Sequence, residues 1–301
     1  MTNDNYQKGL AASFSAFAIW GLAVIFWKQI GHVNSIEILT HRIIWSFVFI
    51  VFLFLISKRY NLSRDLQFAK NWKYLILTTL LLTANWLTFI WAVNSGHVVE
   101  SSLGYFINPL VNVLLGWLFF REKLRKYQAL AVGLAVVSVL VLTINYGHFP
   151  WIAFVLAFTF GLYGMVRKKI NIKSIPGFGA EMFMAVPFAL AYLIYLNIEG
   201  TISFLNSDLL TNILIVATGV VTAVPLLLFN YGVRHLPLKT VGFIQYITPT
   251  GMFILGVFVY KEPFSVTKLI SFILIWAALA IYSFDNYFNY RTRKKNKENS
   301  S

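Results

Sequence analysis

Long apolar stretches follow one another along almost the whole chain, each separated from the next by a few polar residues. A helix crosses the hydrocarbon core of a bilayer in about 20 mainly apolar residues, and ten such stretches are present. They lie near residues 9–30, 36–57, 73–94, 101–120, 127–145, 150–167, 178–197, 209–230, 240–260 and 266–285. Because the connections are short, neighbouring spans are expected to pack as antiparallel hairpins. The pattern predicts an all-α integral membrane protein with ten transmembrane helices.

Composition supports a lipid environment and narrows the chemistry. Of the 301 residues, 58% are hydrophobic and 12% are charged, and the mean hydropathy is +0.69; soluble domains carry about a quarter charged residues. The chain has no cysteine, which excludes disulfides and cysteine-bound metal. It also lacks an H-E-x-x-H motif, a paired-aspartate motif and a phosphate-binding G-x-x-x-x-G-K-[ST] loop. We therefore expect no cofactor, no metal, no ATP-driven pump and no enzymatic activity.

The basic residues indicate how the chain is oriented. The net charge is +14, but the Lys and Arg residues lie in short clusters between apolar stretches rather than on one folded face, which argues against nucleic acid as a partner. With the N-terminus in the cytoplasm, 21 of the 25 Lys and Arg residues fall on the inner side and 3 on the outer side, and Arg42 lies within a span. The positive-inside rule then predicts a multi-pass protein of a bacterial cytoplasmic membrane with both termini cytoplasmic. Residues 287–301 are predicted to be a disordered basic tail, and a homodimer is left open.

The chain contains an internal repeat. A shift of 140 positions places Pro109 on Pro249, Gly116 on Gly256, Arg121 on Lys261 and Glu122 on Glu262. A weaker echo relates Trp20–Gly21 to Tyr163–Gly164. We predict two five-helix repeats, residues 1–145 and 146–286. Five is an odd number, so the second repeat enters the membrane from the opposite side, an inverted topology that recurs in secondary transporters with a binding site near the bilayer midplane.

The repeated prolines predict matched bends. Pro109 and Pro249 lie about two turns into their spans. Proline lacks the backbone N–H and clashes with the carbonyl four residues earlier, which kinks a helix. The alternative is that each proline lies in a first turn, where it disturbs little. We expect kinks around a shared cavity.

Arg42 is the one clearly intramembrane charge. Such residues are costly in lipid and suggest function, and a guanidinium suits a carboxylate-bearing substrate. Two other interpretations stay open: Arg42 extends to the outer interface, or it pairs with Glu37 or Glu100 to join helices. A transport cycle driven by protons needs a titratable group, for which His41, Glu100 and Glu181 are candidates. The coupling ion is not decided by the sequence.

A polar stripe marks a candidate substrate pathway. Tyr105, Asn108 and Asn112 are spaced by three and four residues, so they share one face of the fourth span. Asparagine is poorly suited to lipid, so this face points into protein or a cavity. The further candidates, from the ninth, third and first spans, are Gln245, Tyr246, Thr248, Asn85, Trp86 and Trp20. The alternative for each is a helix–helix hydrogen bond or an interface aromatic. The pairs Arg121–Glu122 and Lys261–Glu262, at membrane exits, are expected to cap helix ends or brace a gate.

Several phrases resemble a known family. The stretches NWLTFIWAVNSGHVVESSLGYFINPLVNVLLGWLFFREKL, HRIIWSF and VRHLPLKTVGFIQYITPT are similar to RarD-like members of the EamA group, in the drug/metabolite transporter superfamily. The resemblance covers the chain apart from its tail. It implies a ten-helix permease, an exporter of a small metabolite or drug-like molecule that works without ATP. Two rival functions remain: a bundle without cargo, structural or sensing, and, less favoured, a membrane-embedded enzyme acting on a lipid.

Overall fold

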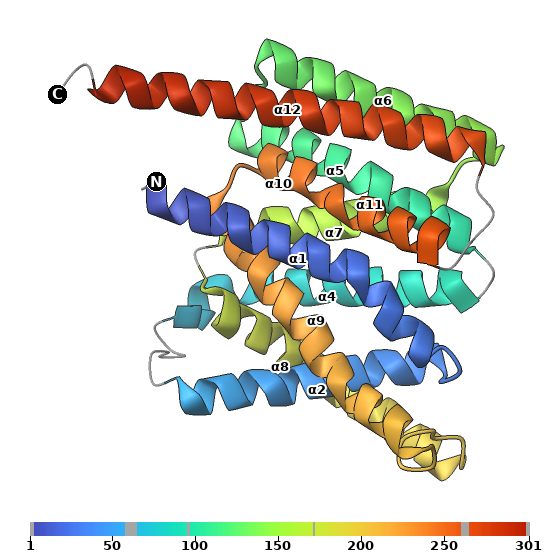
Figure 1. The fold of residues 1–301 in the computed structure, drawn as a ribbon. Helices are drawn as coiled ribbons and strands as arrows, with labels where there is room; N and C mark the ends of the chain where they lie inside the picture. Colours follow the sequence, from blue (N-terminus) through green and yellow to red (C-terminus); the bar gives the residue numbers. More distant parts are fainter. Residues whose placement is uncertain (1–2, 58–64, 95–96, 171, 260–264, 299–301) are drawn as a thin grey trace.

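The computed structural model describes residues 3–57, 65–94, 97–170, 172–259 and 265–298, and over these ranges its regular elements are helices (Figure 1). The first repeat comprises α1 (Asn3–Gln29), α2 (Ser35–Ile56), α4 (Phe68–Asn94), α5 (Val98–Phe120) and α6 (Lys126–Tyr146). The second comprises α7 (Trp151–Lys169), α8 (Ser174–Ile198), α9 (Leu209–His235), α10 (Leu238–Gln245), α11 (Ile247–Ile254), the π-helix η1 (Leu255–Val259) and α12 (Val266–Glu298). The two ends of the chain lie at the same end of the bundle.

Ten segments cross the bundle, as predicted. In the described part of the chain, nine helices are long and apolar enough to span a membrane. The remaining crossing is made by α10, α11 and η1 in succession, where the sequence predicts one span at 240–260. Large apolar side chains such as Phe188 and Ile198 are 79% and 77% exposed. A surface of this kind is suited to lipid rather than to water.

The two matched prolines behave differently. Pro249 lies in the first turn of α11, and α10 ends at Gln245, the residue whose carbonyl a proline at 249 would meet. The ninth span is therefore interrupted at Tyr246, whose backbone angles stay in the right-handed helical region. Pro109 lies inside α5, which runs without a break from Val98 to Phe120.

The helix packing has the symmetry of the repeat. α5 packs on α7 in the same way that α11 and α10 pack on α1, and α4–α7 has its counterpart in α9–α1. The pairs α2–α8, α5–α10 and α6–α12 join a helix to its own repeat equivalent, and α6 and α12 lie together at one edge in Figure 1. The bundle is therefore built around an approximate twofold relation between its halves.

Two hydrogen bonds identify the repeat register. The Asn108 amide donates to the Ala157 carbonyl at 2.9 Å, and the Thr248 hydroxyl donates to the Phe17 carbonyl at 2.8 Å. Both partners are related by the shift of 140. The same shift pairs Gly21 with Gly161, so the predicted match of Trp20–Gly21 to Tyr163–Gly164 was three residues out of register. A short motif of one aromatic and one glycine is too weak to fix register in a chain rich in both.

A contact between repeat-equivalent segments demonstrates the inverted topology. Glu122, just beyond the end of α5, accepts hydrogen bonds from the backbone N–H groups of Leu238 and Lys239 at the start of α10, at 2.8 and 3.0 Å. α5 and α10 are repeat equivalents, yet the end of one meets the beginning of the other. They therefore run in opposite directions.

The C-terminal helix continues beyond its predicted span. The sequence predicts disorder from residue 287, whereas α12 continues to Glu298. Lys, Arg and Glu are favourable helix formers, so a strongly charged composition does not by itself end a helix that is already nucleated in the bundle. Asp285, near the exit, forms an ion pair with Arg125, which attaches this part of α12 to the start of α6.

Candidate functional site

Arg42 lies between two indole rings inside the helix bundle. Arg42 belongs to α2, which is capped at its N-terminus by Asn34. The Asn34 side chain accepts a hydrogen bond from the Ile36 backbone N–H at 2.9 Å and fixes the beginning of the helix. The Arg42 guanidinium carbon is 4.8 Å from the Trp27 ring centroid and 4.7 Å from that of Trp86. Such distances are typical of cation–π contacts, which favour the charged form of the arginine.

The hydrogen-bonding edge of the Arg42 guanidinium has few partners among the described residues. Its Nε donates to the Thr222 hydroxyl of α9 at 3.0 Å, and Tyr105 of α5 is near enough to interact electrostatically. The structure pairs the residue with no carboxylate among the described side chains, and it keeps partial exposure. The indoles of Trp27 and Trp86 lie against the guanidinium, and among the described residues its Nη nitrogens have no hydrogen-bond partner.

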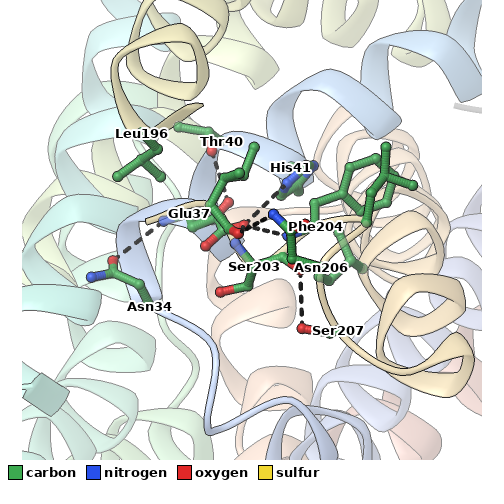
Figure 2. Close-up of polar contacts among 12 residues, drawn as sticks. Asn34, Glu37, Thr40, His41, Leu196, Ser203, Phe204, Asn206 and Ser207 are labelled. Carbon is green, nitrogen blue, oxygen red and sulfur yellow. Dashed lines mark hydrogen bonds and ion pairs between the residues drawn. The ribbon is translucent and has the colours of Figure 1, made fainter. Parts of the chain in front are cut away.

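Glu37 does not serve as the partner of Arg42. Its Oε1 accepts from the backbone N–H groups of Ser203 and Phe204 at 2.8 and 2.9 Å, and His41 Nε2 lies 3.8 Å away (Figure 2). The side chain of Glu100, the other acid considered for Arg42, lies outside the described residues. The helix-joining interpretation of Arg42 therefore loses one of its two acids.

The second repeat holds a buried ion pair close to the position equivalent to Arg42. The shift of 140 places Trp27 on Arg167 and Arg42 on Met182, the residue after Glu181. Arg167 and Glu181 are fully buried, and Arg167 Nη1 lies 3.5 Å from Glu181 Oε1. The sequence groups Arg167 with the loop charges, and this was wrong: it lies inside the bundle, against α8.

Two further side chains complete this second cluster. The Tyr163 hydroxyl donates to Glu181 Oε2 at 3.1 Å, and the Asn230 amide donates to the Tyr163 oxygen at 2.8 Å. The cluster therefore joins α7, α8 and α9. Sequence reasoning missed Tyr163 and Asn230, because a tyrosine and an asparagine in separate apolar spans give no signal of contact without a partner prediction.

The predicted polar stripe on α5 forms a bridge between the repeats. Asn112 donates to Asn108 Oδ1 at 3.1 Å and to Gln245 Oε1 at 2.8 Å. All three side chains are buried, with exposures of 4% for Asn108, 0% for Asn112 and 4% for Gln245. Each has a partner on another helix or on the same stripe. Their role as pathway-lining residues stays a prediction.

Some of the remaining predicted pathway residues are buried, and others are partly exposed. The Tyr246 hydroxyl donates to the Phe106 carbonyl at 3.2 Å, and Tyr246 is almost fully buried. Asn85 donates to the Leu156 carbonyl at 2.9 Å and to Thr159 at 3.0 Å, which attaches α4 to α7. Trp20 lies among aromatic rings, with centroid distances of 5.5 Å to Phe17, 5.6 Å to Phe160 and 5.9 Å to Phe229. Trp20, Arg42, Asn85 and Tyr105 are partly exposed.

The charged pairs at the membrane exits were expected to cap or to gate. Glu122 caps α10 of the other repeat and lies 3.9 Å from Lys168 of α7. Its capping role is therefore exercised between the repeats rather than on its own helix. Lys261 and Glu262, the equivalent pair, lie outside the described residues. Among the described residues no cluster of three His, Asp or Glu side chains is arranged to hold a metal ion.

Comparison with known proteins assigns the family. The model of the EamA-like transporter family matches residues 7–144 and 150–284. The chain belongs to this family. The match occurs twice, once in each half, as the repeated packing requires. The family is named for transporters. The long apolar helices of this chain are those of a multi-pass membrane protein.

Individual relatives agree over almost the full length. Protein RarD of Escherichia coli strain K12 is 42% identical over 290 residues, which cover 96% of this chain and 98% of that protein. An uncharacterized transporter of Vibrio cholerae is 42% identical over 288 residues, 95% of each chain. A solved structure titled "Crystal structure of protein" superposes with a TM-score of 0.70 at 15% identity, covering 91% of this chain and 96% of that one. At that identity the likeness is one of fold.

Proposed function

We propose that this EamA-like transporter exports a small organic anion across the cytoplasmic membrane and recognises the anion at Arg42. The supporting observation is the difference between two sites that lie at similar places in the two repeats. Arg167 has the carboxylate of Glu181 at 3.5 Å, whereas Arg42 has indole faces and a hydroxyl but no described carboxylate. A carboxylate of the cargo would supply the missing partner, held in the plane of the guanidinium.

The transport pathway that we propose lies between the repeats. Trp20, Arg42, Asn85 and Tyr105 retain partial exposure and would contact cargo. The buried Asn108–Asn112–Gln245 bridge, with Tyr246 and Thr248 next in the chain, would separate the two ends of the pathway, and Trp86 would hold the Arg42 guanidinium in place. Rocking of residues 1–145 against 146–286 would expose Arg42 to each side in turn, as inverted repeats allow. Both termini and the tail from residue 287 would be cytoplasmic.

The test compares cells that overproduce the wild-type chain with cells that overproduce variants. Metabolites would be profiled inside and outside the cells at equal surface levels of protein. An organic anion should accumulate outside with wild type and with Lys268→Gln, which removes an exposed cation far from the site. Arg42→Gln should abolish that accumulation, and Arg42→Lys should retain part of it, because a lysine keeps the charge without the planar fork.

Unchanged export by Arg42→Gln would overturn the assignment of Arg42. A wild-type profile equal to that of cells without the protein would instead support the cargo-free bundle. The family membership and the names of the relatives favour transport over that alternative and over a lipid-modifying enzyme.

A further inference from the structure

A second polar stripe occupies the outer part of α2 and takes no part in the Arg42 site. Glu37, His41 and Trp45 are spaced by four residues and therefore share one face of the helix. Glu37 is fully buried and His41 is 1% exposed. Figure 2 shows Glu37 and His41 directed toward the segment that contains Ser203 and Phe204, the connection between α8 and α9.

The Glu37 carboxylate holds this connection against α2. One oxygen, Oε1, accepts both the Ser203 and the Phe204 N–H, at 2.8 and 2.9 Å. The Phe204 ring covers the imidazole of His41, with 4.8 Å between centroids, and reaches Trp45 at 6.1 Å. Hydrogen bonds to an ionised acceptor are roughly twice as strong as neutral ones. The attachment of the connection therefore depends on the charge of Glu37.

The stripe also carries polar atoms that lack partners. Glu37 Oε2, both ring nitrogens of His41 and the Trp45 Nε1 are buried with no hydrogen bond in the described structure. Leaving such a group unpaired costs about 1–3 kcal/mol. Four of them lie along one helix face, so a hydrogen bond made there in another state of the protein would remove part of this cost.

The neighbours of Glu37 leave His41 as its ionisable partner. α2 packs on α4, α8 and α9. From α8, Tyr192 interacts electrostatically with Glu37. At the start of α9, Asp208 is engaged by the hydroxyl and N–H of Thr211. The described part of α4 contributes no charged contact to Glu37, and the approach of His41 Nε2 to Oε1 is 3.8 Å, too long for a hydrogen bond.

We propose that Glu37 and His41 together form a proton-binding site that releases the α8–α9 connection when one proton is bound. The added proton resides on the Glu37 carboxyl, which loses its negative charge, and the carboxyl O–H donates to His41 Nε2, so that the 3.8 Å approach becomes a hydrogen bond. Oε1 then turns toward His41 and away from the two amides. The proton comes from the outer solution and returns to it from the same two residues. No covalent bond to carbon forms or breaks. Use of this step to drive export rests on the proposed function.

The absence of cysteine in the chain allows a direct test on the full-length protein in nanodiscs. Ser203→Cys reports release of the connection, and Leu209→Cys, at a position 77% exposed, reports the intrinsic pH dependence of thiol labelling. The ratio of their rates with a polar maleimide should rise at least about threefold between pH ~8 and pH ~5. In a Glu37→Gln background the ratio should be high at every pH.

A wild-type ratio that stays constant over this range would overturn the proposal, as would the same pH dependence in Glu37→Gln. Infrared difference spectra give a second readout that does not depend on labelling. A protonated-carboxyl band should appear on acidification in wild type and in Glu181→Gln, and should be missing in Glu37→Gln. Its presence in Glu37→Gln would count against the site. A positive result here with no exported anion would separate this proposal from failure of the transport function.

Discussion

The crossing of α5 and α10 should not tolerate a side chain at Gly242. A Cβ atom there would lie 2.6 Å from the Pro109 carbonyl oxygen and 3.2 Å from the Asn112 Cβ. Relieving the first contact to 3.4 Å requires a movement of about 0.8 Å between the helices. The same movement would lengthen the Asn112–Gln245 hydrogen bond from 2.8 Å to about 3.6 Å, beyond the range of such bonds.

The expected loss of stability in Gly242→Ala has two parts. Overpacking of a tight contact costs about 1–3 kcal/mol, and loss of the buried hydrogen bond adds about 1 kcal/mol. The free energy of unfolding should therefore fall by about 2–4 kcal/mol. Denaturant unfolding of the detergent-solubilised protein, followed by circular dichroism, measures it.

Gly133 provides the matched control for this substitution. A Cβ at Gly133, on α6, would meet no atom within 4 Å. Gly133→Ala should leave the unfolding midpoint unchanged or raise it slightly, since alanine is the better helix former by about 1 kcal/mol. If Gly242→Ala and Gly133→Ala unfold at the same midpoint, the close approach of the repeats at this crossing is refuted.

Two further outcomes follow from the charges. Glu181→Gln should lower the free energy of unfolding by about 3–5 kcal/mol, because it leaves the buried charge of Arg167 without its acid. Arg42→Gln should have little effect on the free energy of unfolding. An equal loss for both substitutions would make Arg42 a structural group. In intact cells an impermeant maleimide should label Phe149→Cys but not Tyr127→Cys, two positions that are 68% and 61% exposed, and the reverse pattern would place both termini outside.

Much of the fold was predictable because lipid imposes one simple requirement, an apolar helix of sufficient length. The ten crossings and the inverted repeat follow from hydropathy and from the match of Pro109 to Pro249. The break at Tyr246 did not follow, because a proline permits either a kink or an interruption and the choice depends on packing. Pro109, in the matching position, leaves its helix continuous.

The candidate site was predictable only in part, because residue type does not reveal which neighbour a side chain meets. Arg42 was identified by its position within a span, but the Trp27 and Trp86 rings around it come from two other helices. Arg167 looked like a loop residue, since it begins a basic run that ends α7. Its burial depends on the contact with Glu181, which neither helix indicates by itself.

The two repeats share a backbone plan and differ in where charge is balanced. Under the shift of 140, Trp27 corresponds to Arg167, and Arg42 falls one residue beyond the position of Glu181. If each repeat held an ion pair like Arg167–Glu181, both halves would be stabilised and no arginine would be left for a carboxylate of the cargo. In the first repeat two indoles contact the Arg42 guanidinium, and no carboxylate of the described residues is paired with it. Because an inverted repeat presents equivalent positions toward opposite sides of the membrane, the two halves would present different charges to the two sides, and this difference would support the anion recognition that we propose for Arg42.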